Sequence, residues 1–201
     1  MRTAVFGRPI VIASSPKVAS SSILQWIYAA KHGQRYDGDQ LHTLPMFRGM
    51  SVPIGYREEG AVHIAVHREG FARMASAWNH WVMLRPGWQG EGLRQLCPTL
   101  DAFAEHFPEA MNRDGMVAHH CGLQVRCLGT DPGSYDITIP MAKLGDLAEH
   151  LRHRYGMEVP PIPVTNRFEY AQECSARASA MLKAYTALDA LCGWDGVEVR
   201  W

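Results

Sequence analysis

The sequence predicts an α/β fold of three layers, with a central parallel sheet flanked by helices. Three apolar stretches have the composition of strands, and each is followed by a segment whose apolar residues recur at helical spacing. The expected strands are Pro9–Ser14, 61–68 and 135–140, and the helices that follow them are Ser20–His32, 70–84 and 143–156. Strands that alternate with helices are typical of a parallel sheet. A chain of 201 residues is long enough for one core, so we expect a single domain over residues 1–201.

The first two strand–helix units carry clear local signals. Pro9–Ser14 is one continuous apolar run, and Gly33 stops the helix that comes after it. The helix 70–84 has a single apolar stripe that places Trp78 in the core. The next segment, 85–97, contains three glycines and one proline, which predicts a loop.

Fewer signals mark the second half of the chain. A short helix is expected over Thr99–Phe107, with its first residue as the N-cap. The stretch 135–140 alternates like a strand, and the helix 143–156 ends at Gly156. A last long helix is expected over residues 169–191.

Composition and charge exclude several classes of partner. Lysine plus arginine and aspartate plus glutamate both number 20, so the formal net charge is zero and no nucleic-acid partner is expected. No apolar run approaches the roughly 20 residues of a membrane span, and the N-terminus lacks the long apolar stretch of a signal peptide. The five cysteines form no CxxC pair, which favours reduced thiols and a cytoplasmic location.

The stretch SSPKVASSS, residues 14–22, predicts a site for an anion. It connects a strand to a helix start, where backbone N–H groups and the helix dipole favour negative charge. Lys17 adds a mobile positive charge, and Ser20, Ser21 and Ser22 add hydroxyl donors. The alternative is that these serines only cap the helix. The turn has no glycine, and its lysine comes three residues before the serines, so it does not match the GxxxxGK[ST] loop of ATP-binding proteins.

A second polar pair follows the next strand. Arg68 stands at the strand end and Ser76 on the second turn of the following helix, and this eight-residue spacing lets both side chains converge on one group. A guanidinium suits a phosphate because it can bind two oxygens at once. A surface ion pair is the alternative for Arg68.

Together the two stretches resemble the nucleotide signatures of sulfotransferases that use 3′-phosphoadenylyl sulfate (PAPS), in particular the carbohydrate-sulfotransferase branch. The first signature of that family reads like PKVAxTS and the second like RxPxxRxxSxY. The residues here are Pro16, Lys17, Val18, Ala19, Ser20, Ser21 and Ser22 for the first, and Arg68, Gly70, Arg73, Ser76 and Trp78 for the second. Glycine replaces the usual proline and tryptophan the usual tyrosine, and neither change removes a phosphate ligand.

Three further segments continue the resemblance. They are HCGLQVRC at 120–127, YDITIPMAKLGDLAEHL at 135–151, and Asn166 together with YTALDALCGW at 185–194. The cysteine of the first segment lies one residue closer than in the family, and the second lacks an acidic residue that the family often has. The match covers most of the chain in order, and it implies that the three-layer domain is P-loop-like.

The resemblance implies a role for each signature residue. The residues implied for binding PAPS are Pro16, Lys17, Val18, Ala19, Ser20, Ser21, Ser22, Arg68, Ser76, Asn166 and Arg167. Lys17 and the serines would hold the 5′-phosphosulfate, and Arg68 with Ser76 would hold the 3′-phosphate. Sulfuryl transfer resembles phosphoryl transfer in needing positioning and charge stabilisation, so Lys17 would neutralise the bridging oxygen as the bisphosphate product PAP leaves. No metal is expected.

The acceptor hydroxyl must lose a proton, and a neutral histidine accepts one near pH 7. His42 is the first candidate, because several sulfotransferases carry their base on this part of the chain; a solvated loop histidine is the alternative. His120 is the second candidate and could instead shape the acceptor pocket. Asp39 and Glu58 could also act as bases but have no supporting spacing.

Two further groups of side chains stand out in the sequence. Trp81 and Trp88 are candidates for stacking against an acceptor. A zinc site is not expected from His119, His120, Cys121 and Cys127, because adjacent residues rarely reach one metal together.

The sequence thus predicts an enzyme that moves a sulfuryl group from PAPS to a hydroxyl of a saccharide or another small acceptor, by in-line displacement. One alternative is a P-loop-type small-molecule kinase, which would need ATP and Mg²⁺. The other is a nucleotide-binding module without catalysis.

Overall fold

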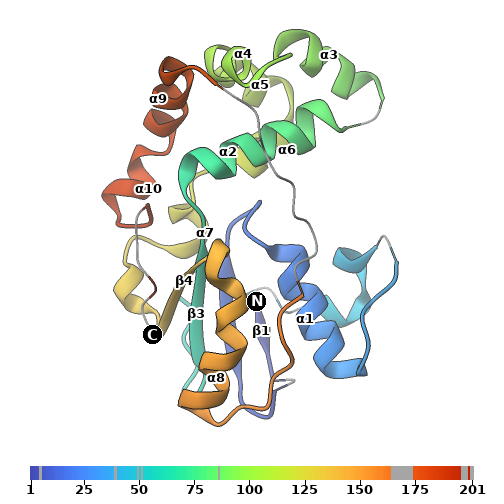
Figure 1. Ribbon diagram of the computed structural model, residues 1–201, viewed down its shortest axis with the longest axis vertical. Coiled ribbons are helices and arrows are strands. Elements are labelled where there is room, and N and C mark those ends of the chain that lie inside the picture. Colours follow the sequence, from blue (N-terminus) through green and yellow to red (C-terminus); the bar gives the residue numbers. More distant parts are fainter. Residues whose placement is uncertain are drawn as a thin grey trace.

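The computed structural model describes residues 1–163, 174–195 and 199, except positions 5, 39, 49, 51 and 86. Three residues singled out above, Asn166, Arg167 and Asp39, lie outside the described residues, and so does the side chain of Trp88. The described elements form a sheet flanked by helices, with a further group of helices beyond the ends of the strands (Figure 1). The predicted α/β class is confirmed.

Four strands form one mixed sheet in the order β1-β2-β3-β4. Their bounds are Arg2–Thr3 for β1, Ile10–Ser14 for β2, Val62–His67 for β3 and Ile137–Pro140 for β4. β2, β3 and β4 run parallel, as predicted for three of the strands. β1 is antiparallel to β2, so the sheet is not wholly parallel. A strand of two residues is too short to show an alternating pattern, which is why β1 was not predicted.

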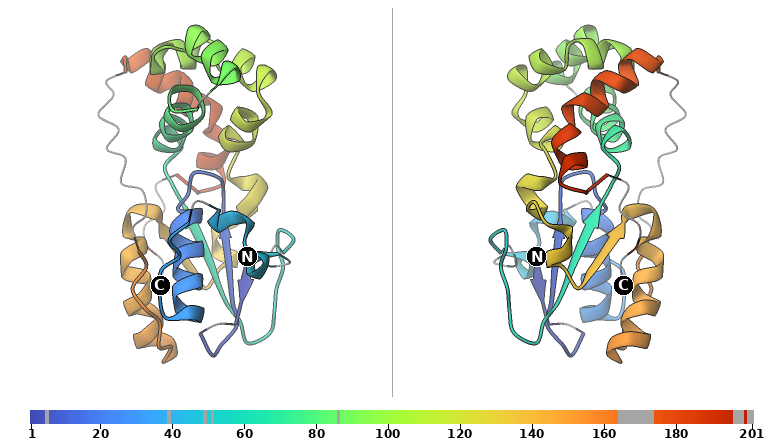
Figure 2. Two further views of the ribbon diagram at one scale, coloured as in Figure 1. Left: turned by 90° about the vertical axis from the view of Figure 1, so that its right-hand side faces the viewer. Right: turned by 90° about the vertical axis from the view of Figure 1, so that its left-hand side faces the viewer.

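Two helices cover one face of the sheet. α1, Ser20–His32, has the predicted bounds, and α8, Leu147–Tyr155, lies on the same side of the strands (Figure 2). Alternate strand residues such as Ile12 and Ile64 point to this face and pack with Trp26 of α1 in one buried cluster.

The opposite face of the sheet is covered less fully. α7, Val125–Leu128, has only four residues. Its Leu128 packs with Ala65 of β3 and with Trp194 in a small cluster, and the half-buried Ala13 of β2 contacts this cluster. The two faces therefore carry very different amounts of helix.

The remaining helices gather beyond the carboxyl ends of the strands (Figure 1). They are α2 Gly70–Trp78, α3 Trp88–Leu96, α4 Leu100–Glu105, α5 Phe107–Arg113, α6 Gly115–Cys121 and α9 Ala176–Tyr185, which is followed by α10 Ala187–Leu191. Their core contains Trp78, as predicted, together with Phe103 and Leu182. Short 3₁₀ turns occur at Leu41–Thr43, Pro45–Phe47, Pro132–Ser134 and Met141–Asp146. None of the helices described is long and apolar enough to cross a membrane.

Three expectations about helices are wrong. Residues 85–97 are not a loop, because most of them form α3; its Gly90 is packed so tightly that a Cβ would lie 2.3 Å from the Arg85 carbonyl oxygen. The last helix is not continuous where it is described, since α9 and α10 are separate helices that meet at Thr186. The helix 70–84 is α-helical only to Trp78 and continues as a π-helical turn. α5, α6 and α7 were not predicted at all.

Gly70 begins α2 at a place with no room for a side chain. A Cβ built there would lie 2.2 Å from Oγ1 of the buried Thr186. The Gly70 N–H also donates a hydrogen bond to Oδ1 of Asp195, at 3.2 Å. A proline, which the family resemblance would place here, would clash with Thr186 and lose this bond. The glycine is therefore matched to the close approach of Thr186, at the junction of α9 and α10, to the start of α2.

We expect Gly70→Ala to lower the free energy of unfolding by about 1–3 kcal/mol, because the added methyl group overpacks the contact with Thr186. Gly92→Ala is the matched control: it lies in α3 with open space around its Cβ position. A helical Gly→Ala change of this kind stabilises by about 0.5–1 kcal/mol. Urea denaturation measures the change in the free energy of unfolding for both variants. No change in Gly70→Ala would show that Thr186 moves to make room for the methyl group.

Candidate functional site

The predicted anion turn and Arg68 lie together at the carboxyl edge of the parallel strands. β2 ends at Ser14 and continues through the turn into α1, while β3 ends at His67 and continues through Arg68 into α2. β2 and β3 are direct neighbours in the sheet, so their two turns are adjacent. In open α/β sheets this edge is where ligands bind.

The turn has an unusual backbone. Lys17 and Ala19 have φ angles of 63° and 52°, in the left-handed region that costs a non-glycine residue about 1–2 kcal/mol. Between them Val18 is fully buried and anchors the turn in the core, so its side chain is not available to a ligand. Strain of this kind persists only where the surrounding structure holds it, and it is common at ligand sites.

In the described part of the chain, the N-cap residue of α1 provides no side-chain cap. Ala19 occupies the N-cap position, makes no side-chain cap hydrogen bond, and is followed by a first turn without an acidic residue. In α2, by contrast, the Glu69 carboxylate accepts a hydrogen bond from the Ala72 N–H at 2.7 Å. The first N–H groups of a helix need acceptors, so α1 is the helix start that suits an external anion.

Arg68 is tied to this turn through both its side chain and its backbone. Its guanidinium donates to the Lys17 carbonyl oxygen at 3.1 Å. The buried Gln124 side chain accepts from the Arg68 N–H at 3.1 Å and donates to the Arg68 carbonyl at 2.7 Å. The same Gln124 oxygen accepts from the Ser15 hydroxyl at 3.4 Å. One amide therefore joins the turn after β2 to the turn after β3.

A second buried polar residue fixes the connection between α6 and α7. Arg73 is fully buried and donates to the carbonyl oxygens of His120, at 3.3 Å, and Gly122, at 2.6 Å. It also pairs with Asp189 at 3.3 Å, and that carboxylate accepts from the Val125 N–H at 3.0 Å. The Arg73–Asp189 pair thus holds the segment that carries both His120 and Gln124.

Lys17 lies in a strongly positive environment. Burial, and then the charge of Arg68, lower the pKa of Lys17 to about 8. The charge of Lys17 in turn contributes, after burial, to the lowered pKa values of His80 and His120. We call Lys17, Arg68, His80 and His120 the cationic cluster, in which Lys17 and Arg68 carry the positive charge. Among the described residues no carboxylate contributes to the shift at Lys17, whereas Cys121 makes a smaller contribution that raises this pKa.

His120 is held in one tautomer. Its Nδ1 lies 2.8 Å from the Met116 carbonyl oxygen, which can only accept, so the proton is on Nδ1 and Nε2 keeps its lone pair. Burial is the main cause that lowers the pKa of His120 to about 4. The ring lies against Trp81, with centroids 4.6 Å apart. The buried Trp81 Nε1 has no hydrogen-bond partner among the described residues. Trp81, predicted to contact the acceptor substrate, could therefore also donate a hydrogen bond.

His42 occupies a different position. Its Nε2 lies 2.9 Å from the hydroxyl of Ser21, in the first turn of α1. Desolvation lowers its pKa. His42 therefore stands beside the predicted serines, whereas the charge of Lys17 acts on His80 and His120.

Other predicted residues are less accessible. Ser76 is 4 % exposed, so a phosphate would reach its hydroxyl only by displacing the atoms that cover it. The five cysteines are free thiols. Among the described residues, no three His, Cys, Asp or Glu side chains are grouped as a metal ion would need.

Sequence reasoning missed Gln124, Arg73 and Asp189 as parts of the site. Gln124 and Asp189 lie in segments that carry the family resemblance, and Arg73 lies in its second signature, but no role was assigned to any of them. All three are fully buried. Their partners are distant in sequence, so local patterns do not reveal what they hold.

We expect trace acetylation of Lys17 by acetic anhydride to rise with a midpoint near pH 8, because burial and Arg68 disfavour the charged amine. Inorganic sulfate should move that midpoint upward, since a bound anion stabilises the charged form. Mass spectrometry reports the other lysines, such as Lys31 of α1, in the same sample. A midpoint near 10.5, the ordinary value, would contradict the environment described for Lys17.

Comparison of the chain with models of protein families, with curated proteins and with solved structures found no match in any of the three. The case for a function therefore depends on the chemistry of the cationic cluster and on the signature residues themselves.

Proposed function

We propose that the protein is a PAPS-dependent sulfotransferase with a P-loop-like nucleotide site, which transfers a sulfuryl group to the hydroxyl of a small acceptor. The observation that carries the proposal is the uncapped, strained start of α1, which stands beside Lys17 and Arg68. An anion at this point would accept hydrogen bonds from the first N–H groups of α1 and would interact with the positive charges of Lys17 and Arg68.

Lys17 has the charge that is needed to stabilise a leaving group. With a pKa of about 8, it is protonated in roughly nine molecules of ten at pH 7. In the proposed reaction the acceptor oxygen forms a bond to sulfur while the bond from sulfur to the bridging phosphate oxygen breaks. PAP leaves with the negative charge that develops on this oxygen, and the Lys17 ammonium stabilises it.

We assign the proton of the acceptor hydroxyl to His120. Its neutral Nε2 and its electrostatic contact with Lys17 support this choice over His42. His42 would instead orient the Ser21 hydroxyl toward the phosphosulfate. Trp81, which lies against His120, would form one wall of the acceptor site, and its ring suits the apolar face of a sugar.

Arg68 would bind the 3′-phosphate that distinguishes PAPS from ATP. Its guanidinium is half-buried beside the turn, whereas Ser76 is covered. A small-molecule kinase is the second candidate, but it would need carboxylates to hold Mg²⁺ near the phosphates. No described carboxylate shifts the pKa of Lys17. A non-catalytic module would bind PAP without turnover.

PAP should bind much more tightly than AMP in isothermal titration calorimetry, and Arg68→Gln should remove most of the difference. Loss of a charge-assisted contact costs about 1.5–3 kcal/mol, which is at least tenfold in affinity for PAP. AMP has no 3′-phosphate and serves as the control ligand, because a collapsed turn would weaken both ligands. Arg8→Gln, at an exposed arginine that donates to Gly60, is the control variant. Equal wild-type affinities for PAP and AMP would reject the proposal.

The pH dependence of kcat/KM tests whether the base has the strongly lowered pKa of His120. A base whose pKa is about 4 stays neutral, so the rate should change little between pH 7 and pH 5.5, and it should fall above about pH 8 as Lys17 loses its proton. A base with the ordinary pKa of about 6.5 would lose about eightfold over the acid range.

The matched variants are His120→Asn and His42→Asn, measured with an acceptor found by screening alcohols and saccharides with labelled PAPS. His120→Asn should lower kcat by about 10²–10⁴-fold and leave PAP affinity unchanged. The reverse pattern would make His42 the base.

A further inference from the structure

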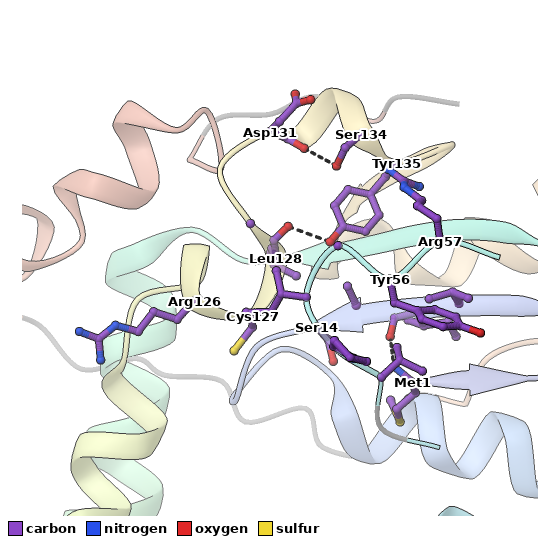
Figure 3. Close-up of a pocket in the computed structure, with 18 of the residues that line it drawn as sticks. Met1, Ser14, Tyr56, Arg57, Arg126, Cys127, Leu128, Asp131, Ser134 and Tyr135 are labelled. Atoms are coloured by element: carbon purple, nitrogen blue, oxygen red, sulfur yellow. Dashed lines mark hydrogen bonds between the residues drawn. The ribbon is translucent and has the colours of Figure 1, made fainter. Parts of the chain in front are cut away.

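A cavity of about 430 Å³ lies on the less covered face of the sheet (Figure 3). Its floor includes Val11 and Ala13 of β2. Its walls come from residues 52–57, from 126–131 and from 134–135. None of the four residues of the cationic cluster lines it. Cavities of a few hundred Å³ built from several segments are the usual size for small-molecule sites.

The cavity exists because the two faces of the sheet are covered differently. Strands of a parallel sheet normally carry helices on both faces. Here the face opposite α1 has the four-residue α7 and the Trp194 side chain, and Ala13 contributes only a methyl group to its floor. The part of the floor formed by Val11 and Ala13 is therefore apolar, as contact with an aromatic ring would require.

One wall combines an aromatic ring with a positive charge. The Tyr135 hydroxyl donates to the Leu128 carbonyl oxygen at 2.7 Å, which fixes the ring. The Arg57 guanidinium lies over that ring, 5.6 Å from its centroid. Figure 3 shows Arg57 beside Tyr135, while the Arg126 side chain extends away from it. The carboxylate in the lining, Asp131, accepts a hydrogen bond from the Gly133 N–H at 2.8 Å.

We propose that this cavity binds a small planar anion, such as an aromatic carboxylate, as a second ligand site of the protein. The ring would lie on Val11 and Ala13, and the acidic group would bind Arg57. Stacking on Tyr135 holds the guanidinium in place, so less side-chain freedom is lost when the anion binds. This inference goes beyond the sulfotransferase proposal and does not depend on it.

The probe is 2-naphthoate, titrated by calorimetry into the full chain, with neutral 2-naphthamide as its isostere. The wild-type protein should bind the carboxylate about tenfold more tightly than the amide. Arg57→Gln should bring the two affinities together, and Arg8→Gln, at an arginine outside the cavity, should not. No binding of naphthoate, or equal binding by the Arg57→Gln variant, would overturn the proposal.

Protection of cysteines from alkylation tests where 2-naphthoate binds. Cys127 lines the cavity and Cys174 does not, and both are half-buried free thiols. Saturating 2-naphthoate should slow alkylation of Cys127 by N-ethylmaleimide at least fivefold and leave Cys174 unchanged. PAP should not displace the probe; displacement, or protection of neither cysteine, would place the probe elsewhere and reject the site.

Discussion

The buried side chain of Gln124 is the contact on which the geometry of the candidate site depends. It bonds both backbone groups of Arg68 and the hydroxyl of Ser15, so it joins the ends of β2 and β3 to the segment between α6 and α7. A buried amide that loses such partners costs about 1–3 kcal/mol for each group left unsatisfied. These bonds thus fix the position of the sheet relative to the helices beyond its edge, near Lys17 and His120.

The site also lowers the stability of the free protein. Two residues of the turn have left-handed backbone conformations, and Lys17 is partly desolvated beside Arg68. Because the folded pKa of Lys17 is below its ordinary value, the unfolded chain binds more protons between about pH 8 and pH 10.5, and this group adds stability as the pH rises through that range. A bound anion would offset the unfavourable charge, since it would neutralise Lys17 and accept hydrogen bonds from the first N–H groups of α1, whereas the backbone strain would remain.

Local signals in the sequence predicted the local parts of the structure. α1 begins and ends where its apolar spacing and Gly33 indicate, and the adjacency of Lys17 and Arg68 follows from two parallel strands that end at the same edge. The glycines around α3 were misleading, because Gly90 is required by a close contact rather than by a loop. Gln124 and Ser15 are 109 residues apart, and Arg73 and Asp189 are 116 apart. Such pairings depend on the folded topology, and no periodicity or spacing reveals them.

Burial acts on the two titratable groups of the site in a way that keeps their roles separate. It lowers the pKa of Lys17 from 10.5 to about 8 and the pKa of His120 from 6.5 to about 4. Both shifts have the same sign and similar size, so the gap of about four units between the groups is preserved. Near neutral pH the amine is therefore mostly charged and the imidazole neutral, and the charge of Lys17 contributes to keeping the imidazole neutral. The proposed sulfuryl transfer would use this division of charge, with a cation for the leaving oxygen and a base for the attacking one.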